Sequence, residues 1–304
     1  MGVRQNLREG VVVTRDNLRA TKKELIDGAD GREILLLFGI IPGILLAVEL
    51  AILSNYWILA SVKRSVFWLE IIGQPLFSLD TLVDSYISSI AHSDWETHLK
   101  PNLTNYLLCL TALYPMAILS NRKSEVSKIV LILLFATPLV TTVASFQYPM
   151  GARSIGFSGV LSAFFGVLPV VMFAAIDSHI DKNLNPFWSG MVMFAVYASI
   201  YVYFGNVILT GVTILFVLLF FIGMVIRIGL DGLMEALQVV FGIGYLPFLW
   251  ALVIAYAGAV GMYYNLPLGT NIVAHLAGYI FGFIVGFLWL GESFSVDWIS
   301  YDWA

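Results

Sequence analysis

Eight segments of about twenty apolar residues recur along this chain, and they constrain its fold more than any other feature. A helix needs about 20 consecutive apolar residues to cross the hydrocarbon core of a bilayer. Because no water reaches that core, an open sheet edge or loop could not satisfy its backbone there. The sequence therefore predicts an all-α polytopic membrane protein with about eight transmembrane helices. The predicted spans are residues 35–54, 102–121, 127–147, 157–176, 186–204, 207–226, 238–262 and 271–291.

The composition agrees with this prediction. Of the 304 residues, 59% are hydrophobic and only 12% are charged, whereas soluble domains are about 25% charged. The net charge of −4 is small and no basic tract occurs, so nucleic acid is not an expected partner. The single cysteine, Cys109, excludes an intrachain disulfide and a multi-cysteine metal site. We expect neither a metal nor a cofactor.

Glycines and a proline mark two of the connections between spans. Gly205 and Asn206 alone separate the fifth span from the sixth, which predicts a tight turn. Gly242, Gly244 and Pro247 stand near the start of the seventh span and predict a kink there.

The basic residues fix an orientation. With the N-terminus inside, twelve Lys and Arg lie on inner segments and four on outer ones, which is the positive-inside bias of multi-pass proteins. We therefore expect a plasma-membrane protein with a cytoplasmic N-terminal tail (residues 1–32), a transmembrane domain (33–292) and a short cytoplasmic C-terminal tail (293–304). The four outer basic residues are Lys63, Arg64, Lys100 and Arg153.

The first outer loop, residues 55–101, is unusually apolar for a segment in water. It contains two tryptophans, Trp57 and Trp68, besides several aliphatic residues. We expect it to pack on the outer leaflet, either as a folded loop or as a functional surface.

Four polar side chains lie near the starts of spans, where they are costly and therefore indicate function. They are Ser158, His275, His98 and Asn102. Spans two, four and eight all run from outside to inside, so all four side chains belong to the outer side of the membrane. Three spans separate Ser158 from His275, and this odd number returns the chain to the same side.

The chemistry follows from the residue types. A serine hydroxyl is a weak nucleophile until a base removes its proton, and a neutral imidazole is the usual base. A helix start also leaves backbone N–H groups unpaired, which could stabilise an oxyanion. Gly156 and Gly159 flank Ser158 and would let another backbone approach. The alternative is that Ser158 only caps the helix.

His98 and Asn102 are four residues apart and share one helical face. An imidazole N–H and an Asn amide are both good donors for an oxyanion. Pro101 indicates either a kink in this helix or a new helix start, and both remain open.

Glycines recur every four residues along the last span. Gly278, Gly282 and Gly286 form a smooth stripe, against which Gly159 and Gly166 of the fourth span could pack closely. Such packing would bring Ser158 and His275 together.

These motifs together resemble the rhomboid family of intramembrane serine proteases. The chain has a G-x-S-G motif (Gly156 to Gly159), an H-x-x-x-N pair (His98, Asn102) and a late histidine followed by spaced glycines (His275, Gly278, Gly282). The resemblance implies Ser158 as nucleophile, His275 as general base, and oxyanion donors from His98, Asn102 and the Ser158 N–H. It also implies membrane-protein substrates with a transmembrane helix, cut near its outer end.

The family core has six spans, so the resemblance implies one added hairpin of two spans. The family often has a tyrosine that stacks on the histidine, one turn after the serine, where this chain has Ser162. Two other functions remain open from the sequence. One is a catalytically inactive rhomboid-like protein that binds and routes membrane-protein clients. The other is a transporter, which would require broken helices in two matching halves.

Overall fold

The computed structural model describes residues 16–54, 85–87, 89–92, 95–145, 156–180, 184–242, 245–264 and 271–291, and every regular element in these ranges is helical. A first helix covers residues 16–28. The elements that follow are α2 (Gly31–Ile34), π-helical η1 (Leu35–Ile40), α3 (Ile41–Ser54), π-helical η2 (Trp95–Leu99), α6 (Lys100–Leu119), α7 (Lys123–Ser145), α8 (Ser158–Asp177), 3₁₀-helical η3 (Pro186–Ser189), α9 (Gly190–Tyr203), α10 (Val207–Phe241), α11 (Leu246–Val253), π-helical η5 (Ile254–Gly258), α12 (Ala259–Gly261) and α13 (Ile272–Gly291).

Seven helices in the described ranges are long and apolar enough to cross a membrane, so the chain is an all-α multi-pass membrane protein. Seven of the eight predicted spans correspond to these helices, and the remaining one differs in length. The seventh predicted span, 238–262, is a shorter apolar helix over Leu246–Gly261. Gly242 has extended backbone angles and ends α10, and Pro247 lies in the first turn of α11. The expected kink is therefore a break between two helices.

Helix α10 runs to Phe241, well past the predicted end of the sixth span at residue 226. Its backbone leaves the helical region at Gly229, where φ is 73° and ψ is 176°. The predicted span stops before Arg227, because Asp231, Glu235 and Gln238 then interrupt the apolar run every three or four residues. The tight turn predicted between the fifth and sixth spans is confirmed, with Gly205 at a φ of 70°.

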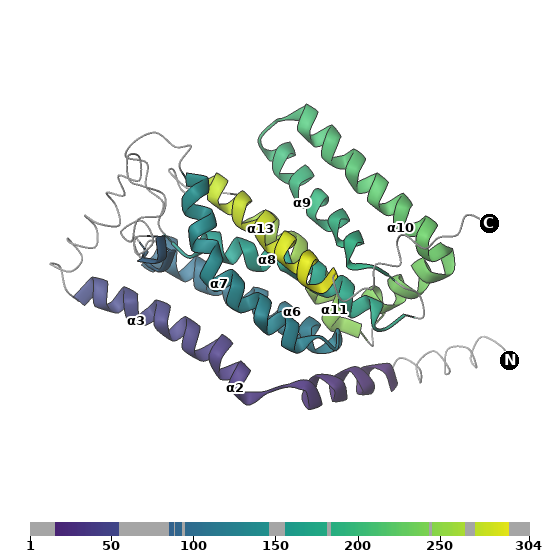
Figure 1. The fold of residues 1–304 in the computed structure, drawn as a ribbon, viewed down its shortest axis with the longest axis horizontal. Helices are drawn as coiled ribbons and strands as arrows, with labels where there is room; N and C mark the ends of the chain where they lie inside the picture. Colours follow the sequence, from purple (N-terminus) through teal and green to yellow (C-terminus); the bar gives the residue numbers. More distant parts are fainter. Residues whose placement is uncertain are drawn as a thin grey trace.

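Helix α8 forms the centre of the bundle. Figure 1 shows it enclosed by neighbouring helices, and it packs against α6, α7 and α13. All residues of its most apolar stretch are buried inside the protein. A helix that is apolar on every side is expected in such a position. Ser158 is thus held at one end of the most enclosed helix in the described structure.

The predicted glycine contact between α8 and α13 is confirmed. A Cβ atom at Gly278 would overlap the carbonyl oxygen of Gly159, and one at Gly282 would overlap that of Ala163. From the other helix, a Cβ at Gly166 would overlap the carbonyl of Tyr279. The two backbones therefore touch, which is possible only where side chains are absent.

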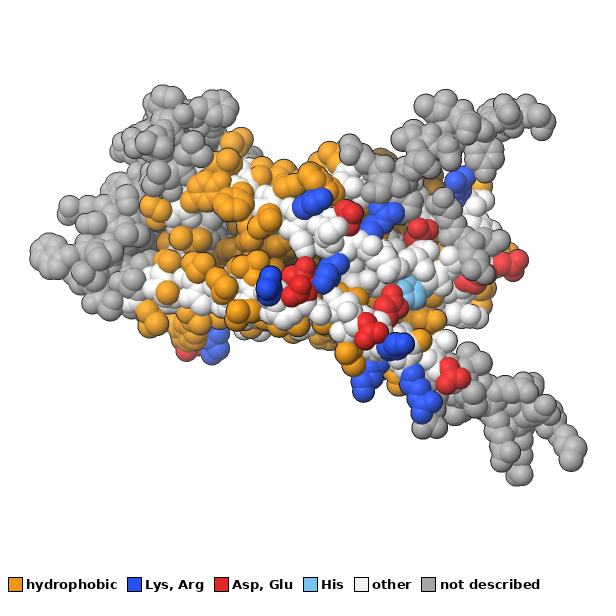
Figure 2. Space-filling view, turned by 60° about the horizontal axis from the view of Figure 1, so that its bottom comes forward, with side chains coloured by type: hydrophobic (Ala, Val, Ile, Leu, Met, Phe, Trp, Pro, Cys, Tyr) orange, Lys and Arg blue, Asp and Glu red, His pale blue; other side chains and the backbone are white. Residues whose placement is uncertain are grey.

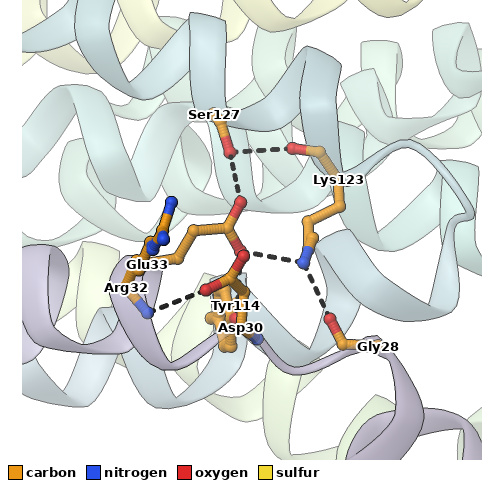
Figure 3. A network of polar contacts seen from close by, with 7 residues as sticks. All are labelled: Gly28, Asp30, Arg32, Glu33, Tyr114, Lys123 and Ser127. Carbon is orange, nitrogen blue, oxygen red and sulfur yellow. Dashed lines mark hydrogen bonds and ion pairs between the residues drawn. The ribbon is translucent and has the colours of Figure 1, made fainter.

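A polar network ties the first helices to the bundle at the end opposite Ser158 (Figure 3). The Glu33 carboxylate lies 3.0 Å from the Lys123 ammonium and accepts a hydrogen bond of 3.1 Å from the Tyr114 hydroxyl. Lys123 also donates to the Gly28 carbonyl at 2.8 Å. The helix at 16–28 is joined to the turn that follows α8 by a 3.6 Å contact between Glu24 and His179.

Charged side chains gather toward one end of the molecule, and hydrophobic side chains dominate the remaining surface in Figure 2. We call this the charged end, defined by Glu33, Lys123 and Asp177. It also contains the C-terminal end of α13, because Arg122 donates to the Leu290 carbonyl at 3.3 Å. Most of the apolar first loop, residues 1–15 of the predicted N-terminal tail, the whole predicted C-terminal tail and several of the basic residues used for orientation lie outside the described residues.

Candidate active site

Ser158 is the first residue of α8 and follows a sharp turn. Gly156 has a φ of 111°, which side chains other than hydrogen rarely permit. Phe157 occupies the N-cap position, and no side chain caps the helix. The Ser158 hydroxyl is therefore not used as a cap in this structure, which argues against the alternative of a purely structural serine.

The expected contact between Ser158 and His275 is present. The Ser158 Oγ lies 2.7 Å from the His275 Nε2, although 117 residues separate the two in sequence. His275 lies in the first turns of α13 and is only 3% exposed. The close approach of α8 and α13 through their glycines places this pair, as the sequence indicated.

The other ring nitrogen of His275 fixes its protonation state. Nδ1 lies 3.2 Å from the backbone carbonyl of Met262. A carbonyl oxygen can only accept, so Nδ1 carries the proton and donates it to Met262. Nε2 then presents a lone pair and accepts from the Ser158 hydroxyl. This tautomer is the one that a general base for serine requires.

Residues at the end of α12 replace the tyrosine that the family resemblance led us to expect at Ser162. Ser162 is buried, and its hydroxyl has no hydrogen-bond partner among the described residues. The Tyr263 ring instead meets His275 edge to face, with 6.0 Å between ring centroids. Sequence reasoning missed Met262 and Tyr263, because a backbone carbonyl has no residue signature and the apolar run gave no sign of where the helix ends.

Asn102 lies in the first turn of α6, the helix that packs against α8. It is 6% exposed, and its amide nitrogen has no hydrogen-bond partner within the described ranges. Pro101 begins no separate helix, because the helical stretch is continuous from Trp95 to Leu119 with a π-helical first turn. An unpaired buried amide is expensive, so this donor is suited to a group that arrives later.

His98 packs directly on the turn before Ser158. A Cβ at Gly156 would overlap the His98 Nε2, so only glycine fits beneath the ring. His92 meets His98 edge to face, with 5.1 Å between centroids, and its Nε2 accepts the Phe157 N–H at 3.4 Å. In the structure His92 supports the turn that carries the serine.

The backbone N–H groups of Ser158 and its next two neighbours have no partner within α8, because the first intrahelical bond runs from the Leu161 N–H to the Phe157 carbonyl. The partial positive charge of the helix start adds to them. Hydroxyl, base and donors therefore meet at one point.

Other polar residues lie elsewhere. His179 is at the charged end, and Cys109 is buried within α6. Within the described ranges, no group of three or more His, Cys, Asp or Glu side chains could hold a metal ion. In comparisons with protein-family models, with curated proteins and with solved structures, nothing matched this chain.

Proposed function

We propose that this protein is an intramembrane serine protease of the rhomboid type, which hydrolyses peptide bonds in or near transmembrane helices of other membrane proteins. The observation that carries the proposal is the 2.7 Å contact between the Ser158 hydroxyl and the His275 Nε2 at a helix start. The contact alone would also suit a structural hydrogen bond. The tautomer set by Met262 favours chemistry, and so does the buried Asn102 amide, which has no partner among the described residues.

In the proposed reaction, the Ser158 oxygen attacks the scissile carbonyl carbon while His275 Nε2 takes the hydroxyl proton. The Met262 carbonyl stabilises the imidazolium that forms, because it accepts a hydrogen bond from Nδ1. The oxyanion binds to the Ser158 N–H, the Asn102 amide and His98. His275 gives its proton to the leaving amine, and water then hydrolyses the acyl-enzyme with the same histidine as base.

The added hairpin in this proposal is α9 and α10. These helices pack mainly against each other, and Figure 1 shows them at the edge of the bundle. Only 11% of the residues in the most apolar stretch of α10 are buried inside the protein. The segment from α11 to α12 instead reaches the site through Met262, so it belongs with the six core helices. The basic residues support a plasma-membrane protein with both termini in the cytoplasm.

A covalent probe tests the proposal without knowledge of the substrate. Purified protein in phosphatidylcholine proteoliposomes is treated with a fluorescent fluorophosphonate, and labelled protein is counted by gel fluorescence and mass spectrometry. We expect labelling at Ser158, none in Ser158→Ala, and a reduction of about 10⁴-fold in rate for His275→Ala. Ser162→Ala is the matched control, because it removes a buried hydroxyl one turn away and should label normally.

Cleavage of a reporter membrane helix by the same variants completes the test. If the wild type neither labels nor cleaves while remaining folded, the protease proposal is wrong. The two alternatives, a catalytically inactive client-binding protein and a transporter, would then remain.

A further inference from the structure

The last three turns of α10, residues 230–241, differ from the rest of that helix. We call them the terminal segment. Gly229 separates them from the preceding spanning stretch with its non-helical backbone. Figure 1 shows the ribbon change direction at this end of α10, so the terminal segment does not continue along the axis of the hairpin.

One face of the terminal segment is apolar and exposed. Leu230 is 70% exposed and Phe241 is 58% exposed, with Met234 and Leu237 exposed between them. Their spacings of four, three and four residues place all four on one side of a helix. Large apolar side chains at helical spacing would be an unusual surface if water covered them.

The other two faces have different surroundings. Asp231, Glu235 and Gln238 form a polar stripe, which lies about 100° around the helix from the apolar face. The remaining face, which includes Ala236 and Val240, is buried against the protein core. Asp231 and Gln238 are exposed, whereas Glu235 is partly exposed and one of its carboxylate oxygens is buried. The segment therefore has one face against protein, one partly exposed polar face and one apolar face that no described part of the chain covers.

The apolar face is also hollowed. A shallow cavity of about 470 Å³ opens at its C-terminal end, and nearly all of its surface is apolar. It is lined by Met234, Leu237, Gln238, Phe241 and Gly242.

Continuity with the spanning stretch of α10 indicates what covers this face. Before Gly229 the same helix exposes a long series of large apolar side chains, from Val207 to Ile226, along a length that crosses a membrane. Exposed charged residues appear only at the boundary, at Arg227 and Asp231. A helix that follows such a boundary and has one apolar and one polar side, as the terminal segment has, lies in the plane of a membrane surface with its apolar side among acyl chains.

We propose that the terminal segment is an interfacial helix at the charged end of the bundle. Its apolar face inserts among the phospholipid acyl chains, and methylene groups of one chain fill the hollow beside Phe241. Asp231 and Gln238 face water. This surface lies at the opposite end of the bundle from Ser158, so it is independent of the proposed protease activity.

Site-specific fluorescence quenching tests this placement. Single cysteines at Met234 and Asp231 are labelled with bimane in the full-length protein, reconstituted in phosphatidylcholine vesicles. Cys109 is fully buried, and the unsubstituted chain measures any labelling there. One quencher is a phosphatidylcholine with a doxyl group near the headgroup end of its acyl chain, and the other is aqueous iodide. Met234→Cys and Asp231→Cys form a matched pair, because they occupy adjacent faces less than one turn apart.

We expect doxyl lipid to quench the Met234 label about threefold more than the Asp231 label, and iodide to show the opposite order, since interfacial helices bury their apolar face below the headgroups. Equal quenching of both labels by iodide would overturn the proposal. So would a Met234 label shielded from both quenchers, because protein would then cover the face, either a second copy or another segment of this chain.

Discussion

The substitution Gly278→Ala should separate the two helices that hold Ser158 and His275. A Cβ at position 278 would overlap the backbone carbonyl oxygen of Gly159, which cannot move aside as a side chain could. Atoms in non-bonded contact settle at about 3.5–4.0 Å. Helix α13 must therefore retreat from α8 by roughly 1 Å near this position.

The retreat acts on a contact that tolerates little movement. The Ser158 Oγ and His275 Nε2 are 2.7 Å apart, and a shift of roughly 1 Å would take them beyond the hydrogen-bond limit of about 3.2 Å. A misplacement of this size can reduce a catalysed rate about 100-fold. The extra methyl group should also cost about 1–3 kcal/mol of stability, the usual range for overpacking.

The assay is the rate of fluorophosphonate labelling, measured together with thermal unfolding in the same proteoliposomes. Two other glycines supply controls for the same substitution. Gly211 in α10 has open space around it, so Gly211→Ala should label and unfold like the wild type. Gly286→Ala meets the Val167 side chain, which can rotate, and should have an intermediate effect. If Gly278→Ala is folded and labels at the wild-type rate, the close backbone packing does not set the geometry of the pair.

Three further substitutions address separate parts of the structure. Gly156→Ala should lower the labelling rate and the melting temperature together. A φ of 111° is strained for alanine, and the new methyl group would displace His98. An unchanged labelling rate would contradict this account of the turn. Asn102→Ala should reduce reporter cleavage about 10²- to 10³-fold with little change in melting temperature, as expected for loss of an oxyanion donor; a large loss of stability instead would indicate a structural role. Glu33→Ala should destabilise the protein by about 1–3 kcal/mol in thermal unfolding, because Tyr114 and Lys123 lose their common acceptor. Glu96→Ala is the control: it breaks an exposed pair with Lys100 and should change stability by less than about 0.5 kcal/mol.

The features that the sequence could predict are those that follow from its hydropathy pattern and from the spacing of its glycines. Long apolar runs predicted the helices, since a bilayer leaves few alternatives for such segments. The four-residue spacing of Gly278 and Gly282 predicted the close contact with α8, and with it the proximity of Ser158 and His275. These inferences succeed because a row of small residues on one face of a membrane helix usually marks the place where another helix packs closely.

Features that depend on backbone groups or on tertiary neighbours could not be read from the sequence. The Met262 carbonyl orients His275, but any residue type would present a carbonyl there. The break at Gly242 ends α10 inside the predicted seventh span, 238–262, and that region is apolar enough to look like one continuous span. The network around Glu33 joins residues more than 80 positions apart, and no local pattern marks such pairs.

The start of α8 explains how a serine can be available for chemistry at a place where serines usually serve as caps. The side-chain oxygen of a capping serine accepts a hydrogen bond from a backbone N–H of the first turn. Here Phe157 occupies the cap position, and the Phe157 N–H is bound by His92 instead. The Ser158 hydroxyl can then direct its proton to His275, while the first N–H groups of the helix have no partner within α8. In the proposed protease, the nucleophile and the oxyanion donors would therefore come from the same few residues, because His92 supports the turn that a capping serine would otherwise support.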